Sequence, residues 1–497
     1  MTGVGRMSWF GQKQSLPRGL VAALFAVALA TPLAGCLLTD KPEPAIDIPE
    51  RYTLAPRSEH AAAAALPALD WWRSFRSREL TEIVEQARES NLDIAAAVAR
   101  IVQADAQARI AGAALLPIVQ LDADAAKSQS SRSLGSGSGT GGARIRNSFQ
   151  AALSASYEID FWGKNRAALR AAEETAVASR FDREVVALAT VVAAANAYFQ
   201  VLTAQDRLQV ARENIASATR VLDLVRQRLD AGTASQLDVS QQEVLVNQQR
   251  ASIPALEQTL RQNRVALAVL MGLPPERVTV RGGTLRSVAI PRVTPGLPSQ
   301  LLTQRPDIRE AEAQLAAANA NVENARAQFL PSITLTGQGG YQSAVLRTLL
   351  EPQSAFYSIA AGLTQPIFQG GQLLGNLDQQ KGRQDELLQN YRKAVISAFG
   401  DVEVALEAVR QSALQVRLQT DVVTSSQRAF DISEQRLREG TVDLITVLAS
   451  QQALFNAQDA LVQARLQRLQ AIVSLYQALG GGWLPKPPLV AEAIDAR

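Results

Sequence analysis

The sequence predicts a mixed α/β membrane protein that is mostly helical, with long antiparallel helical hairpins and four β-strands in a two-fold internal repeat. Three observations predict this fold: two very long tracts with few helix breakers, four segments in which polar and apolar residues alternate, and self-similarity along most of the chain. The 497-residue chain is 47% apolar but only 5% aromatic, and such a composition favours long helices over a sheet-rich core.

Residues 1–35 are typical of a secretion signal. Three basic residues and no acidic one precede an apolar stretch at 20–33. This stretch is too short to span a bilayer comfortably. The stretch ends in Leu33-Ala34-Gly35-Cys36, and Cys36 is the only cysteine of the chain. Because small residues before a thiol are typical of bacterial lipoprotein signals, we expect a covalent lipid on Cys36. Leu37, rather than an aspartate, follows it and favours the outer membrane.

The remaining composition argues against catalytic and nucleic-acid functions. One cysteine excludes an internal disulfide and a cysteine-based zinc site. The only histidine, His60, lies in a Pro- and Ala-rich lead segment, and no nucleotide loop, metal cluster or catalytic triad is present. Three of the 50 basic residues belong to the signal, so the rest balances the 47 acidic ones and gives no electrostatic case for nucleic-acid binding. We therefore expect no enzyme activity and no cofactor beyond the lipid.

A tandem repeat covers most of the chain. With an offset of 214 residues, Asp93-Ile94 recurs as Asp307-Ile308 and Leu116-Pro117 as Leu330-Pro331. Further on the offset is 208, which relates Arg228-Leu229 to Arg436-Leu437, Gly232-Thr233 to Gly440-Thr441, and Gly272 to Gly480. The change falls around the Gly- and Ser-rich stretch 135–142, where a surface loop tolerates insertions.

Each half begins with a helix, 91–115 or 306–329, that a proline ends. Two strands follow in each half, in which polar and apolar residues alternate over about ten positions. The four expected strands are 118–127, 149–160, 332–341 and 357–363. This length and alternation suit transmembrane barrel strands with one face to lipid and one to a lumen.

A very long helix comes next in each half, 164–231 and 372–439. A helix of that length, about 100 Å at 1.5 Å per residue, does not fit a globule and implies a coiled-coil tube. We expect Gly232 and Gly440 to act as left-handed C-caps that reverse the chain into return helices at 235–271 and 443–479.

Several motifs resemble the outer-membrane efflux protein family, in the branch of lipid-anchored relatives of TolC. They are Leu301-Leu302, Arg305-Pro306-Asp307-Ile308-Arg309-Glu310-Ala311-Glu312, Pro331, Asp70-Trp71-Trp72, Arg436-Leu437-Arg438-Glu439-Gly440 and Leu479-Gly480-Gly481-Gly482-Trp483. The resemblance implies a homotrimer with a twelve-stranded β-barrel in the bacterial outer membrane and a helical α-barrel in the periplasm. It also implies a periplasmic adaptor protein and an inner-membrane transporter of the resistance-nodulation-division type.

The expected organisation follows from the repeat and the resemblance together. A signal peptide (1–35) precedes a lipid-anchored tether and first equatorial helix (36–90). Repeat 1 (91–272) and repeat 2 (305–480) flank a loop-rich equatorial segment (273–304), and an equatorial tail (481–497) ends the chain.

The hairpin tips hold the candidate site residues. The glycine turns, Gly232-Thr233 and Gly440-Thr441, are helix caps to which the resemblance adds a contact with the adaptor. In relatives the helices converge after the second turn and often carry acidic residues at positions that match Thr446 and Ala449 here, which are not acidic. We therefore expect Ile445 to form an apolar gate, with Asp443, Arg438 and Asp238 as polar candidates. Asp443 either pairs with Arg438 or caps its helix.

Three functions fit these predictions: a passive efflux duct for small molecules, a duct for type I protein secretion, and a structural periplasm-spanning lipoprotein without a lumen. Strand alternation argues against the last, and the lipoprotein branch favours efflux. In a barrel we expect lipid to contact Leu153, Tyr157, Ile333, Leu335 and Ile359. Thr334 would face the lumen.

Overall fold

The structure of the protein is a computed structural model that describes residues 45–46, 48–49, 51–53, 68–129, 145–293 and 295–483. The predicted signal peptide, Cys36, His60 and the stretch 135–142 lie outside the described residues. The described chain forms two compact units, each built from both repeats. The first contains residues 111–170 and 318–384, and the second contains residues 45–110, 171–317 and 385–497 as far as they are described.

Helices dominate the described chain, as the sequence predicts. The two long helices are α4 (Lys164–Asp230) and α8 (Gln372–Arg438), and the return helices are α5 (Gln236–Leu270) and α9 (Leu444–Ala478). The shorter ones are α2 (Arg78–Ser90), α3 (Leu92–Ala113), α6 (Pro298–Gln304) and α7 (Pro306–Ala327). The predicted bounds of these repeat helices are confirmed to within two residues.

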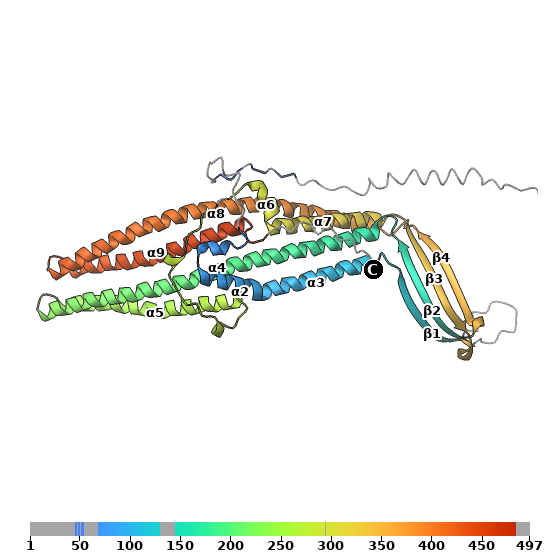
Figure 1. Cartoon of the computed structure of the whole chain (residues 1–497), viewed down its shortest axis with the longest axis horizontal. Helices are drawn as coiled ribbons and strands as arrows, with labels where there is room; N and C mark the ends of the chain where they lie inside the picture. The colour runs from blue at the N-terminus through green and yellow to red at the C-terminus, as the bar shows by residue number, and fades with distance from the viewer. Residues whose placement is uncertain are drawn as a thin grey trace, which may run out of the picture. The chain divides into compact units, whose positions relative to one another are not determined.

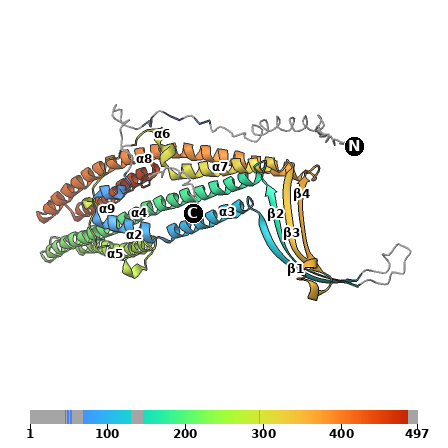
Figure 2. The same ribbon diagram turned by 45° about the vertical axis from the view of Figure 1, so that its right-hand side comes forward.

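The first unit holds one antiparallel sheet of four strands in the order β1-β2-β3-β4 (Figure 1). The strands are β1 (Ile118–Gln129), β2 (Ile145–Ile159), β3 (Ser332–Ser343) and β4 (Ala355–Thr364). All four predicted strands are confirmed, and the largest difference is that β2 begins four residues before position 149. Figure 2 shows the strands side by side along a common curve.

Two helical hairpins make up most of the second unit, with α5 beside α4 and α9 beside α8 (Figures 1 and 2). Apolar side chains from all four helices pack together toward the turns. Val225, Val239, Leu437 and Val447 belong to this cluster. A second cluster lies around the 3-10 helix η2 (Trp71–Phe75), where the Trp71 ring stacks on Tyr476 with centroids 4.7 Å apart. An 18-residue stretch of α4 is apolar enough to cross a membrane, but 56% of it is buried inside the structure, as expected of a core helix.

The glycines that follow the two return helices make equivalent close contacts with the backbone in both repeats. Gly272 follows α5 with φ +65°, and a Cβ there would meet the backbone oxygen of Ser90 at 2.2 Å. Gly480 follows α9 with φ +70°, and a Cβ there would meet the backbone oxygen of Gln304 at 2.7 Å. These contacts are related by the offsets 208 and 214 found in the sequence. At both positions a side chain is excluded by conformation and by space.

Candidate functional site

Strand register sorts the sheet residues onto two faces. Tyr157 lies opposite Leu335 and Leu335 opposite Ala361, so these side chains share a face. By the same pairing and the two-residue period, Leu153, Ile333 and Ile359 lie on that face too. Leu153, Leu335, Tyr357 and Ile359 on it are exposed, the last two at 84% each, whereas Tyr157 and Ile333 are half-buried. The five residues expected to contact lipid therefore share one apolar face.

The opposite face is polar. Gln120, Ser154, Gln338 and Ser358 lie in one row across all four strands, and a hollow of about 360 Å³ lies along this row. Ser154 donates a hydrogen bond of 2.8 Å to Asp122. Thr334, between Ile333 and Leu335, lies on this polar face, as predicted.

Both edges of the sheet are open. Among the described strands, β1 pairs only with β2, and β4 pairs only with β3. Unpaired backbone N–H and C=O groups are costly in hydrocarbon, so a sheet with an apolar face of this kind needs a further strand at each edge before it enters a bilayer.

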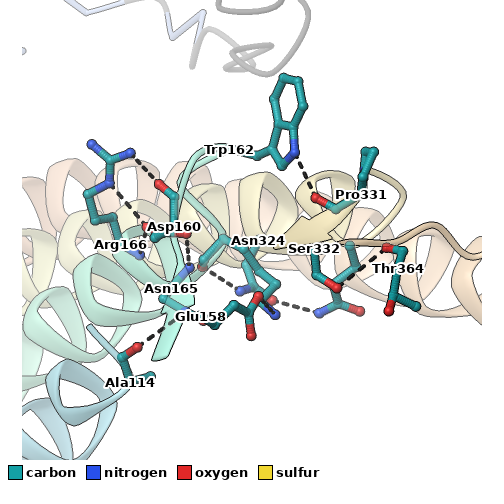
Figure 3. Close-up of polar contacts among 12 residues, drawn as sticks. Ala114, Glu158, Asp160, Trp162, Asn165, Arg166, Asn324, Pro331, Ser332 and Thr364 are labelled. Carbon is teal, nitrogen blue, oxygen red and sulfur yellow. Dashed lines mark hydrogen bonds and ion pairs between the residues drawn. The ribbon is translucent and has the colours of Figure 1, made fainter. Parts of the chain in front are cut away.

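A polar network fixes the passage from β2 into α4 (Figure 3). The Asp160 carboxylate accepts hydrogen bonds of 2.9 Å from the backbone N–H groups of Asn165 and Arg166, in the first turn of α4. Arg166 Nε also donates to Asp160, at 3.1 Å. Asp160 thus serves as a helix cap.

The same junction is tied to the second repeat. Trp162 Nε1 donates to the Pro331 carbonyl at 2.9 Å, and Asn324 Nδ2 donates to the Lys164 carbonyl at 2.7 Å (Figure 3). Asn324 lies on α7 and Pro331 directly precedes β3. These bonds hold the strand-to-helix connections of the two repeats together within the first unit.

The glycine turns have the predicted conformation. Gly232 has φ +75° and Gly440 has φ +71°. Directly after them, Thr233 N donates to the Arg228 carbonyl at 2.8 Å and Thr441 N to the Arg436 carbonyl at 2.9 Å. Both turns are therefore left-handed C-caps that close the end of a long helix.

Arg228 connects the two tips. Its Nη1 donates to the Leu437 carbonyl near the end of α8, and its Nη2 donates to the Thr233 carbonyl at 3.4 Å. A cavity of about 160 Å³ between the tips is lined by Arg228, Asp238, Leu437 and Asp443 among others. Sequence reasoning found Arg228 only as a repeat position and missed this contact.

Asp238 and Asp443 are parts of two equivalent helix caps. Ser235 caps α5, and its hydroxyl donates to Asp238 at 2.8 Å. At the matching positions Asp443 caps α9 and accepts from Thr446 Oγ1 at 2.6 Å and from Thr446 N at 3.0 Å. The acid and the hydroxyl have exchanged places between the repeats. The hydroxyl and the backbone N–H of Thr446 hold the pKa of Asp443 below its usual range.

The expected pair of Asp443 and Arg438 is not present. Arg438 instead forms an ion pair of 2.5 Å with Glu434, one turn earlier on α8, because residues four apart on a helix meet on the same face. Of the two alternatives for Asp443, the helix cap is correct in this chain.

Ile445 is 63% exposed, and Leu237, its counterpart in the first repeat, is 64% exposed. Each is an apolar side chain in the first turn of a return helix, and the described chain leaves most of its surface exposed. The apolar gate at Ile445 stays a prediction. No group of three His, Cys, Asp or Glu side chains within the described residues is placed to hold a metal ion.

The model of the family described as "Outer membrane efflux protein" matches residues 83–273 and 297–481. The pyoverdine export outer membrane protein OpmQ of Pseudomonas aeruginosa is 42% identical over 435 residues, which cover 87% of this chain and 90% of that protein. The toluene efflux pump outer membrane protein TtgF of Pseudomonas putida is 33% identical over 478 residues, 94% of this chain and 98% of that protein.

Solved outer-membrane channels share the fold. The CmeC channel of Campylobacter jejuni superposes with a TM-score of 0.83 at 27% identity, covering 90% of this chain and 95% of that one. The open state of the MtrE channel of Neisseria gonorrhoeae gives a TM-score of 0.79 at 28% identity, with 90% and 98% covered.

Proposed function

The chain belongs to the outer membrane efflux protein family and is an outer-membrane efflux channel, and from this premise we propose that three copies form the passive export duct of a tripartite pump. The observation that carries the proposal is a four-stranded sheet with one apolar face, one polar face and two open edges. Four strands do not enclose a lumen, so several copies must close the barrel. The number three comes from the family resemblance.

The helical tips are the proposed contact with the rest of the pump. Gly232, Thr233, Gly440 and Thr441 form the two exposed turns, and we assign to them the contact with a periplasmic adaptor protein. An inner-membrane transporter of the resistance-nodulation-division type would supply the energy, because a passive duct supplies none.

Anchoring through Cys36 is a separate part of the proposal. It is supported by the Leu-Ala-Gly-Cys sequence that ends at this residue. Mass spectrometry of the mature N-terminus should find lipid on Cys36, and Cys36→Ser should abolish it because a hydroxyl forms no thioether. An unmodified Cys36 in protein purified from the outer membrane would contradict the anchor without affecting the channel.

For the cargo, similarity favours an exported metabolite of the pyoverdine type over an apolar solvent. OpmQ is named for pyoverdine export and is more similar to this chain than TtgF, which is named for toluene. The polar row Gln120, Ser154, Gln338 and Ser358 also suits a hydrophilic cargo in the lumen.

Conductance across planar bilayers tests the proposal directly. The mass of the purified protein, measured by light scattering, should be that of a trimer. The protein should give discrete conductance steps in the bilayer. Protein that inserts without conductance would support the structural lipoprotein instead. Loss of a secreted protein from a deletion strain, with small-molecule export unchanged, would support type I secretion.

A further inference from the structure

The internal repeat is preserved in the pairing register of the sheet. Ile118 of β1 lies opposite Ser156 of β2. Adding 214 to the first position and 208 to the second gives Ser332 and Thr364, and these two residues lie opposite each other in the β3–β4 pair. The second hairpin therefore repeats the first residue for residue.

The contact between the hairpins is present once in the chain, as the β2–β3 pair. Ser156 lies opposite Thr336, and Gln150 lies opposite Gln342. The same offsets convert β2 positions into β4 positions and β3 positions into β1 positions. They convert these two pairs into Thr364 with Asp122 and Ser358 with Ser128, which stand at the two open edges of the sheet.

We propose that β4 pairs with β1 of a second copy of this chain in the register that sets Thr364 opposite Asp122 of the partner subunit. This proposal rests on the trimeric barrel proposed above and specifies how its three sheets join. The joint is the β2–β3 pairing repeated between chains.

The two faces of the sheet agree with this register. It sets Leu363 opposite Ala123 of the partner subunit on the apolar face and Ser358 opposite Ser128 of the partner subunit on the polar face. A shift by one residue would set Leu363 opposite an aspartate and mix the faces. Shifts by two residues keep apolar side chains opposite apolar ones. Among these registers, only the one proposed repeats the β2–β3 pairing through the offsets 208 and 214.

The strand ends agree as well. β2 is paired on both sides and has 15 residues, whereas β4 is paired on one side and has 10. Ile367 and Phe368, just beyond the end of β4, are 89% and 88% exposed. The register sets them opposite Val119 of the partner subunit and Ile118 of the partner subunit. Pairing with a second copy would thus set two exposed apolar side chains beside apolar ones, although Pro366 has no N–H to add to the ladder there.

Disulfide cross-linking of the full chain in outer membranes tests the register, with Cys36, the only native cysteine, left in place for lipid. Oxidised Thr364→Cys/Asp122→Cys protein should run as covalent dimers and trimers on non-reducing gels. Within one chain the two positions lie on opposite edges, three strand spacings apart, and the register also displaces them by eight residues along the strands. They are therefore roughly 30 Å apart, too far for an internal disulfide. Ser358→Cys/Ser128→Cys is a second pair in the same register, in case the first pair impairs folding.

The controls are displaced by two residues on the same face: Thr364→Cys with Asp124→Cys, and Thr364→Cys with Gln120→Cys. We expect each to cross-link at least five-fold less than the in-register pairs. If the protein is a trimer by mass but cross-links best through a displaced pair, or through none of the pairs, the proposed register is wrong and the proposed barrel is unaffected. A protein that is monomeric by mass overturns the barrel together with its register.

Discussion

Arg228 at the end of α4 donates a hydrogen bond to the backbone carbonyl of Leu437 at the end of α8. The contact joins the tips of two hairpins through residues that are 209 positions apart in sequence. Leu437 is buried beneath it, whereas its repeat counterpart Leu229 is only partly buried. The tips of one chain thus form a connected pair, and any movement that parts them must break this bond.

Replacing Arg228 by alanine should loosen the tips. A hydrogen bond from a charged donor contributes about 1.5–3 kcal/mol, and the partial exposure of Arg228 places the loss toward the lower value. Hydrogen–deuterium exchange should be faster in 225–235 and 436–446 of Arg228→Ala.

Arg436→Ala is the matched comparison, because Arg436 is exposed and its side chain forms no hydrogen bond or ion pair with the described residues. Faster exchange in Arg228→Ala alone would limit the contact to the interior of one chain. Equal effects in the assembled protein would mean that Arg436 makes the same contact between subunits. Unchanged exchange in Arg228→Ala would show that the bond does not hold the tips.

Asp443 should act as a cap and not as a charge lock. Asparagine caps helices as well as aspartate does, whereas alanine does not, so Asp443→Ala should speed amide exchange in the first turn of α9 and Asp443→Asn should not. An equal effect of both changes would show that the negative charge matters more than the cap.

The same cap predicts a dependence on pH. Hydrogen bonds from Thr446 lower the pKa of Asp443 in the folded chain. Its stabilising contribution is therefore complete above the unfolded value of about 3.9 and is lost as the pH falls through the lower folded value. Exchange in the first turn of α9, corrected for intrinsic rates, should stay constant from pH 7 to 5. A rise in that window would assign the effect to another group.

Ile445→Ala should raise single-channel conductance, because three exposed isoleucines near the pore axis would exclude water from a narrow opening. Leu237→Ala is the control, since Leu237 is equally exposed at the equivalent position of the other hairpin and is not expected at the axis. If Ile445→Ala leaves conductance unchanged while Asp443→Asn opens the channel, the apolar gate is wrong.

Most of the fold could be predicted because proline and glycine mark its boundaries. Pro306 begins α7, and Gly232 follows α4 by two residues. The two faces of the sheet could be predicted because polar and apolar residues alternate along each strand. A pairing register shifted by one residue would place apolar and polar side chains on the same face. The tip contacts were harder. The partner of Arg228 is a backbone carbonyl, which every residue carries, so sequence gives no sign of it. The sequence left Asp443 either to pair with Arg438 or to cap its helix. It did not single out Glu434, four residues before Arg438 on α8, as the partner of that arginine.

Adjacent residues of β3 should respond oppositely to arginine. Leu335 lies on the apolar face and Thr334 on the polar face. An arginine facing lipid near the bilayer midplane costs about 2–4 kcal/mol, whereas one facing a lumen costs far less. Leu335→Arg should reduce the amount of heat-resistant trimer on gels, and Thr334→Arg should mainly alter conductance. Equal loss of trimer in both variants would contradict the assignment of faces.

Two glycines of the same strand provide a test of the sheet itself. A Cβ on Gly340 would lie 2.2 Å from the Ala151 backbone oxygen and 2.5 Å from the Ala152 Cα, whereas a Cβ on Gly337 would meet nothing within 4 Å. Gly340→Ala must therefore push β2 and β3 apart, and overpacking of this kind costs about 1–3 kcal/mol. We expect Gly340→Ala to reduce trimer yield and the resistance of the trimer to heat, while Gly337→Ala behaves as the native chain. Because fewer trimers would assemble, Gly340→Ala should also lower the yield of the disulfide between Thr364→Cys and Asp122→Cys of the partner subunit. Normal heat resistance in Gly340→Ala would mean that the two strands are farther apart in the membrane than in this structure.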